Sequence, residues 1–209
     1  MAPVLRPRTF FAAILCACVF LPISAVALLS RNPYLFPLTD LPRAVVAAQT
    51  VLALILLPLL FHRFRKEDRL SALLLDSLVA FAVSIPFVVL SALVSLLNLR
   101  SVITSQFLYL AMILLGTTLA TWTLGEFGIS LYLMTVFLLI AAVPLSDEII
   151  AQFRAPLDLS ALSPVALSIQ SVSDQNASLP TLAVACLCLA VAAILWRSIS
   201  LQMKVDKNL

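Results

Sequence analysis

The chain predicts an all-α fold, a polytopic bundle of membrane helices that forms a single domain over residues 1–209. Two observations lead to this class. Hydrophobic residues make up 63% of the chain, charged residues make up 11%, and the mean hydropathy is +1.13, whereas about a quarter of the residues of a soluble domain are charged. The apolar residues also form continuous runs, about twice as long as a barrel strand, which indicates transmembrane helices rather than a β-barrel.

A transmembrane helix needs roughly 20 mainly apolar residues to cross about 30 Å of hydrocarbon. Six stretches of the sequence meet this requirement, and the charged residues are concentrated between them. The third stretch is long enough to cross at a tilt, and the turn Gly125-Glu126 joins the fourth and fifth into a tight hairpin. The predicted spans are 10–29, 44–61, 72–97, 107–124, 127–145 and 179–196.

The Lys and Arg residues of the connections predict the orientation, because cytoplasmic loops carry an excess of them. The most basic connection is LLFHRFRKEDR, residues 59–69, a charged elbow between the second and third spans. With six spans, both termini and the elbow share one side, which holds nine Lys and Arg against four on the other. Both termini are therefore predicted to be cytoplasmic. A compact chain without loop domains is typical of bacteria, so the bacterial inner (plasma) membrane is the expected location.

The first apolar stretch also matches a cleavable signal peptide. Arg6 and Arg8 precede the run 10–23, and small residues follow at Ala25-Val26-Ala27, as at a signal-peptidase site. Cleavage would leave five spans and would break the agreement in side between the elbow and the termini. We therefore expect the first stretch to be retained as a span.

The outer connection 146–180 is predicted to contain two short amphipathic or re-entrant helices. The first, SDEIIAQF, begins with Ser146 and two acidic residues, which suit a helix start. The second, LSPVALSIQSV, begins around Leu162-Ser163-Pro164 and ends before the polar SDQNAS. Both have an apolar side that favours contact with the outer leaflet.

Polar residues inside the spans have two interpretations. Asp76 lies near the cytoplasmic interface, where Arg69 or Lys66 could pair with it, and Gln49 is expected to make hydrogen bonds between helices. A group of threonines in the fourth span either serves the same purpose or lines a polar pathway. The candidate pathway residues are Thr117, Thr118 and Thr121.

No catalytic constellation is present in the sequence. His62 is the single histidine, so the chain has no H-E-x-x-H zinc motif and no Ser-His pair apart from that interfacial position, and it has no phosphate-binding glycine loop. The pairs Cys16/Cys18 and Cys186/Cys188 suggest a soft-metal site, but residues i and i+2 point about 200° apart on a helix, which favours helix packing. We predict no catalytic residue, cofactor or metal, and with a net charge of +3 no nucleic acid partner.

In its layout the chain resembles the membrane subunits of type-2 ATP-binding-cassette exporters. These have six spans with both ends inside, a charged elbow after the second span, and short outer helices before the sixth. Residues 61–69 of the elbow lead into the leucine-rich stretch 70–75, although Leu70-Ser71 stands where the family often has Gly-Thr. The outer Leu162-Ser163-Pro164 is similar to the Asn/Ser-Pro step of the family. The resemblance covers nearly the whole chain, but its motifs are short.

The resemblance implies a transmembrane subunit that forms the translocation path of an ATP-driven exporter, as a homodimer or as a heterodimer with another permease. The elbow 62–71 would couple the chain to a separate ATP-binding subunit. The implied contact residues are Arg63, Arg65, Lys66, Glu67, Asp68 and Arg69. The same residues are alternatively an anchor on anionic membrane lipid, worth about 1 kcal/mol for each basic side chain. A non-catalytic assembly or scaffold subunit and a stand-alone transporter or channel remain as other classes.

Overall fold

The computed structural model describes residues 7–29, 40–63, 70–122, 128–138, 140, 163–173 and 178–205. Within these ranges the chain is helical apart from short turns, and no strand occurs there. The protein is therefore an all-α polytopic helix bundle, as the sequence predicts. Its helices are α1 (Pro7–Leu29), α2 (Leu41–Val51), the π-helical segment η2 (Leu52–Leu56), α3 (Leu57–Arg63), α4 (Leu70–Ser95), α5 (Leu99–Trp122), the short Gly128–Leu138 helix, α7 (Pro164–Ser173) and α8 (Ser178–Val205).

Five helical stretches are long and apolar enough to cross a membrane, and they coincide with five of the six predicted spans. Together they identify an integral membrane protein. The sixth predicted span, 127–145, is described only over Gly128–Leu138 and position 140, and its remaining residues lie outside the described part of the chain. The five stretches are Thr9–Val26, Leu41–Leu60, Leu74–Ser95, Leu99–Ala120 and Leu179–Ile199.

The fourth span begins at Leu99, eight residues before its predicted start at 107. Hydropathy places the start too late because Thr104, Ser105 and Gln106 are polar. In the folded chain the Thr104 hydroxyl donates to the Arg100 carbonyl at 2.8 Å and the Ser105 hydroxyl donates to the Val102 carbonyl at 2.9 Å. Hydroxyls bonded in this way to their own helix can enter the membrane at little cost.

A very short connection links α4 to α5. The Leu97 N–H donates to the Ala92 carbonyl at 3.1 Å, and Leu96 has a φ of 51°, in the left-handed region, which together form a Schellman-type helix end. Asn98 then caps α5, because its side-chain oxygen accepts the Arg100 N–H at 3.1 Å. This turn forces α4 and α5 to run antiparallel.

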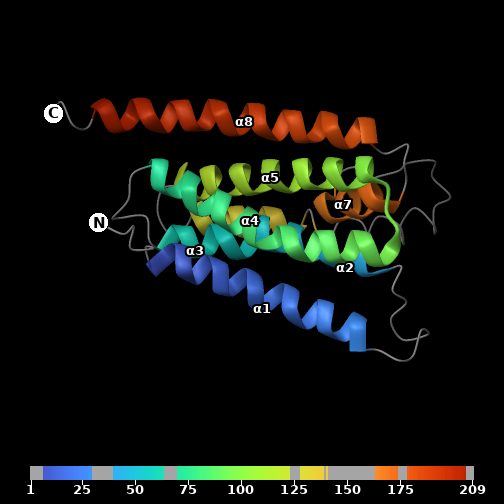
Figure 1. Cartoon of the computed structure of the whole chain (residues 1–209). Helices are drawn as coiled ribbons and strands as arrows, with labels where there is room; N and C mark the ends of the chain where they lie inside the picture. The colour runs from blue at the N-terminus through green and yellow to red at the C-terminus, as the bar shows by residue number, and fades with distance from the viewer. Residues whose placement is uncertain are drawn as a thin grey trace.

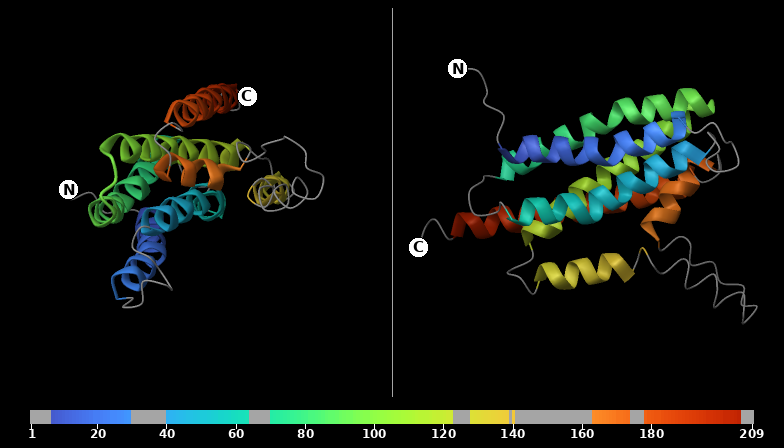
Figure 2. Two further views of the ribbon diagram at one scale, coloured as in Figure 1. Left: turned by 90° about the vertical axis from the view of Figure 1, so that its right-hand side faces the viewer. Right: turned by 90° about the horizontal axis from the view of Figure 1, so that it is seen from below.

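The helices lie side by side with α1 and α8 on opposite sides of the bundle (Figure 1). The most extensive packing joins α5 to α8, α1 to α4, and α2 to α7. The first residues of α1, the last residues of α8 and the facing ends of α3 and α4 are all at one end of the bundle (Figure 1). The α4–α5 turn and α7 are at the other end. The Gly128–Leu138 helix stands at the side of the bundle (Figure 2).

The outer surface of the bundle is strongly apolar. Only 17% of the membrane-length part of α8 and 28% of that of α1 are buried within the chain, and large side chains such as Ile194, Leu187 and Phe10 are exposed. In water such a surface would be an interaction site, but around a membrane bundle it is the surface that lipid covers.

Candidate functional site

Buried and partly buried side chains form a polar layer across α2, α4 and α5. The amides of Gln49 and Gln106 pair reciprocally: Gln49 Nε2 donates to Gln106 Oε1 at 3.0 Å, and Gln106 Nε2 donates to Gln49 Oε1 at 3.1 Å. Gln49 Nε2 also donates to Ser84 Oγ at 3.2 Å. Because no water competes in hydrocarbon, these bonds fix how the three helices meet.

The short helix α7 is held against α2 by side chains rather than lying free on the membrane surface. The hydroxyls of Thr50 and Ser168 are 2.7 Å apart, and Arg43 Nε donates to Ser173 Oγ at 3.0 Å. Ser163 caps the helix before Pro164, since its Oγ accepts the Ala166 N–H at 3.4 Å while its carbonyl accepts the Leu167 N–H at 3.0 Å. The second of the two predicted outer helices is therefore present, and it is packed on the protein. The first, within 146–153, lies outside the described residues.

The second span contains a π-helical segment, η2, with a clear local cause. Pro58 has no N–H, and its ring would collide with the carbonyl of Leu54, four residues earlier. The helix widens there, so that the Leu57 N–H bonds back to the Leu52 carbonyl. The Leu54 carbonyl accepts a hydrogen bond from Tyr132 Oη at 2.7 Å. The widened turn thus binds the side chain of a helix far away in the sequence.

Gly116 of α5 lies directly against this segment. A Cβ atom at position 116 would be 2.5 Å from the Ala53 carbonyl oxygen, 3.1 Å from Pro58 Cγ and 3.3 Å from Tyr132 Oη. Only a glycine lets α5 approach the widened turn so closely. Three parts of the chain therefore meet at the hydroxyl of Tyr132.

Loss of the Tyr132 hydroxyl should destabilise this junction modestly. We expect Tyr132→Phe to lower the free energy of unfolding by about 0.5–1.5 kcal/mol, because the Leu54 carbonyl loses its partner in hydrocarbon. Unfolding in a mild detergent titrated with a denaturing one measures this change. Thr135→Val is the matched control, since that hydroxyl bonds only to the Leu131 carbonyl of its own helix among the contacts described. An equal loss in both variants would contradict the assignment.

A cavity of about 380 Å³ lies beside Tyr132. Five elements contribute to its walls, with Leu54 from η2, Leu115 from α5, Tyr132 from the Gly128–Leu138 helix, Leu167 from α7 and Leu187 from α8. The lining side chains are largely hydrocarbon, so the cavity suits an apolar ligand.

Two of the three threonines predicted as pathway candidates, Thr117 and Thr118, are buried in α5. Thr117 Oγ1 donates to the Ile113 carbonyl at 2.8 Å, and Thr118 Oγ1 donates to the carbonyls of Leu114 and Leu115. Thr117 and Thr118 are 3% and 2% exposed, and the side chain of Thr121 lies outside the described residues. Their role as pathway lining stays a prediction.

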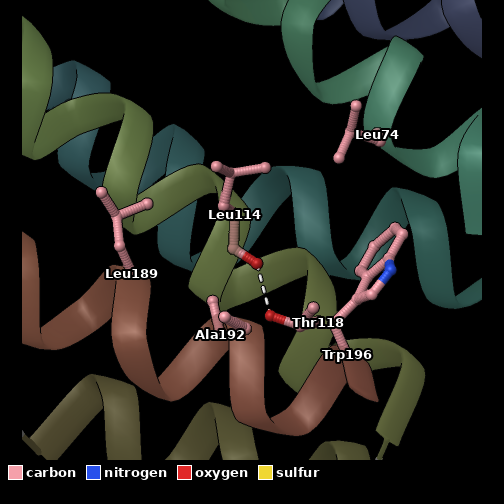
Figure 3. Close-up of a pocket in the computed structure, with 7 residues that line it drawn as sticks. Leu74, Leu114, Thr118, Leu189, Ala192 and Trp196 are labelled. Atoms are coloured by element: carbon pink, nitrogen blue, oxygen red, sulfur yellow. Dashed lines mark hydrogen bonds between the residues drawn. The ribbon is translucent and has the colours of Figure 1, made fainter. Parts of the chain in front are cut away.

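Thr118 does line a cleft of about 320 Å³ between α4, α5 and α8. Figure 3 shows Leu74 on one side, Leu114 and Thr118 on α5, and the indole of Trp196 reaching across from α8. Because the Thr118 hydroxyl is turned toward the Leu114 carbonyl, the cleft presents mainly hydrocarbon. Trp196 has the amphipathic ring that is frequent near a membrane–water interface.

Two further predicted features can be placed in the fold. Asp76 is buried and accepts a hydrogen bond from Thr9 of α1, while Arg69 and Lys66 lie outside the described residues. Cys16 is buried with its thiol 3.8 Å from the Ala80 carbonyl, whereas Cys18 is exposed, as expected for residues i and i+2 of a helix. Across the described residues, no three His, Cys, Asp or Glu side chains lie close enough together to hold a metal.

The elbow residues implied by the family resemblance are mostly outside the described part of the chain. α3 ends at Arg63 and α4 begins at Leu70, so the two helices frame the elbow. The side chain of Arg63 and the residues Arg65, Lys66, Glu67, Asp68 and Arg69 are not described. Their proposed contacts stay predictions.

Comparison of the chain with protein-family models, with curated proteins and with solved structures yields no match.

Proposed function

We propose that the chain is the transmembrane subunit of an ATP-driven exporter in the bacterial plasma membrane. It forms the translocation path together with a second copy or another permease, and ATP is hydrolysed on a separate partner subunit. Both termini and the elbow 62–71 face the cytoplasm in this proposal. The observation that supports it is the common end of the bundle shared by the end of α3, the start of α4, the start of α1 and the end of α8, opposite α7 (Figure 1).

This arrangement supports a coupling role for the elbow. A partner that binds the elbow would act at once on α3 and α4, which frame it. α3 continues without a break into η2 and α2, so the same rod reaches from the elbow to the Thr50–Ser168 contact with α7. A displacement of α3 at its cytoplasmic end would thereby be transmitted to α7, at the opposite end of the bundle. The mixed charges of the elbow suit a protein partner, whereas a simple lipid anchor needs basic residues alone.

Charge reversal in the elbow tests this proposal. We expect the double variant R65E/K66E to recover at least about tenfold less ATP-binding subunit in a mild-detergent purification, the ratio produced by a loss of about 1.4 kcal/mol of binding. The full chain is purified through a C-terminal tag, and ATPase activity in the eluate identifies the partner. R100E is the control, because Arg100 is an exposed basic residue in the first turn of α5, and the start of α5 lies at the opposite end of the bundle from the facing ends of α3 and α4 (Figure 1).

Two results would overturn the proposal. If the chain is crosslinked to its neighbours in intact membranes and then purified, and no ATPase is recovered with it, an assembly or scaffold subunit would be favoured. Transport by the purified chain alone in liposomes would favour a stand-alone transporter or channel. Equal recovery from R65E/K66E and R100E would remove the elbow as the coupling site.

A further inference from the structure

We propose that the cavity beside Tyr132 binds one acyl chain of a membrane phospholipid. Its volume of about 380 Å³ falls in the range of about 300–1,000 Å³ that is typical of ligand sites. It is formed where η2, α5, α7, α8 and the Gly128–Leu138 helix meet. The proposal does not depend on the exporter assignment, because it concerns the walls and the opening of this cavity alone.

The hydroxyl groups of the cavity walls are already used. Tyr132 Oη donates to the Leu54 carbonyl at 2.7 Å, and Thr135 Oγ1 donates to the Leu131 carbonyl at 2.9 Å. Most of the other lining side chains are hydrocarbon, with Met112 and Cys188 adding weakly polar sulfur. A water molecule needs two to four polar partners, so these walls favour an apolar occupant over water or an ion.

The cavity opens toward lipid rather than toward water. Two of its lining residues, Thr135 and Leu187, are exposed on the outside of the bundle, and Leu187 is 64% exposed. Leu187 is nine residues into α8, which is about 14 Å along the helix axis from its start. That position is well inside the hydrocarbon layer of a bilayer about 30 Å thick.

The surroundings of the opening support an acyl chain as the occupant. Other exposed side chains on the two helices that carry Thr135 and Leu187, such as Leu131 on the short helix and Ile194 on α8, are apolar. In a membrane these residues contact the acyl chains of phospholipids. A chain that bends into the cavity loses no hydrogen bond, exchanges one hydrocarbon environment for another and leaves its head group at the interface.

Photolabelling tests the site. The full chain is reconstituted into vesicles of phosphatidylethanolamine and phosphatidylglycerol that contain a phosphatidylglycerol with a diazirine halfway along one acyl chain. Labelled residues are located by tandem mass spectrometry. We expect a label on Met112, which lines the cavity and is only 3% exposed, in addition to labels on lipid-facing residues such as Ile194.

Blocking the opening should remove the internal label. In Thr135→Trp the indole occupies the opening, and we expect the Met112 label to be lost while the Ile194 label persists. Leu187→Trp is a second blocking variant, because Leu187 lines the cavity from α8 rather than from the short helix. It should also remove the Met112 label, and it replaces Thr135→Trp as the test if that change disturbs the short helix. Leu138→Trp adds the same ring to an exposed residue of the same helix that is not among those lining the cavity, and it should preserve both labels.

The proposal fails if Ile194 is labelled and Met112 is not, or if the Met112 label survives in both blocked variants. It also fails if a diazirine-bearing free fatty acid labels Met112 while the phospholipid does not, because the occupant would then be a free fatty acid. None of these measurements involves ATP or an ATP-binding subunit, so they are independent of the exporter proposal.

Discussion

Gly116→Ala should lower the free energy of unfolding by about 1–3 kcal/mol, the usual cost of adding a methyl group to a packed interface. The new Cβ would lie 2.5 Å from the Ala53 carbonyl oxygen. That atom belongs to the backbone, so it cannot rotate away as the end of a flexible side chain would. Either α5 or η2 must move, and both Pro58 and Tyr132 lie within 3.3 Å of the same position.

The measurement is the midpoint of unfolding in a detergent titration, together with retention of a single peak in size-exclusion chromatography. Gly128→Ala is the matched control, because it adds the same methyl group at the first residue of the Gly128–Leu138 helix, and we expect it to change stability by less than about 0.5 kcal/mol. If Gly116→Ala left the stability unchanged, α5 and η2 could not lie as close together as described.

The origin of the π-helical segment can be tested by combining a change at Pro58 with Gly116→Ala. If Pro58 causes the widened turn, Pro58→Ala should let the second span form a regular α-helix and should move the Ala53 carbonyl. The combination of Pro58→Ala with Gly116→Ala should then cost less than the sum of the two single changes, since contacting residues couple. Strict additivity would indicate that the widened turn has another cause.

The fold class and most of the spans follow from the sequence because membrane solvation leaves a strong local pattern. A run of about 20 apolar residues can be recognised without knowledge of its neighbours. The α7 helix was also predictable, since Ser163-Pro164 is a local start signal. The error at the start of α5 arose from Thr104 and Ser105, whose hydroxyls are satisfied by their own helix, a compensation that hydropathy does not include.

The junctions between helices could not be predicted, because they join residues far apart in the chain. Pro58 suggests a kink, but the π-helical segment also requires Gly116 and Tyr132 as neighbours. Gln49 was identified as a hydrogen-bonding residue, yet its partner Gln106 lies 57 positions away and just outside the predicted span 107–124. Nothing in the sequence around Asp76 indicates that Thr9, 67 positions away, is its hydrogen-bond partner. Polar pairing in a membrane is a property of the packed bundle.

Gln49→Leu should destabilise the bundle by about 1–3 kcal/mol, which is the cost of leaving a buried polar group without its partner. The change removes both bonds to Gln106 and the bond to Ser84. Gln106→Leu should cost less, because Gln49 keeps its bond to Ser84. The double variant Gln49→Leu/Gln106→Leu should be less destabilised than the sum of the single changes, since two apolar side chains leave no unpaired amide.

A double-mutant cycle measured by detergent unfolding gives this coupling directly. Cycles of this kind in membrane proteins average about 0.6 kcal/mol and reach about 1.7 kcal/mol, and the two-bond reciprocal pair should lie in the upper half of that range. Thr104→Val is the control, because its hydroxyl bonds to the Arg100 carbonyl of its own helix and joins no second helix through that bond. If the single changes were additive, the two amides would not meet, and α2 and α5 would pack in another register.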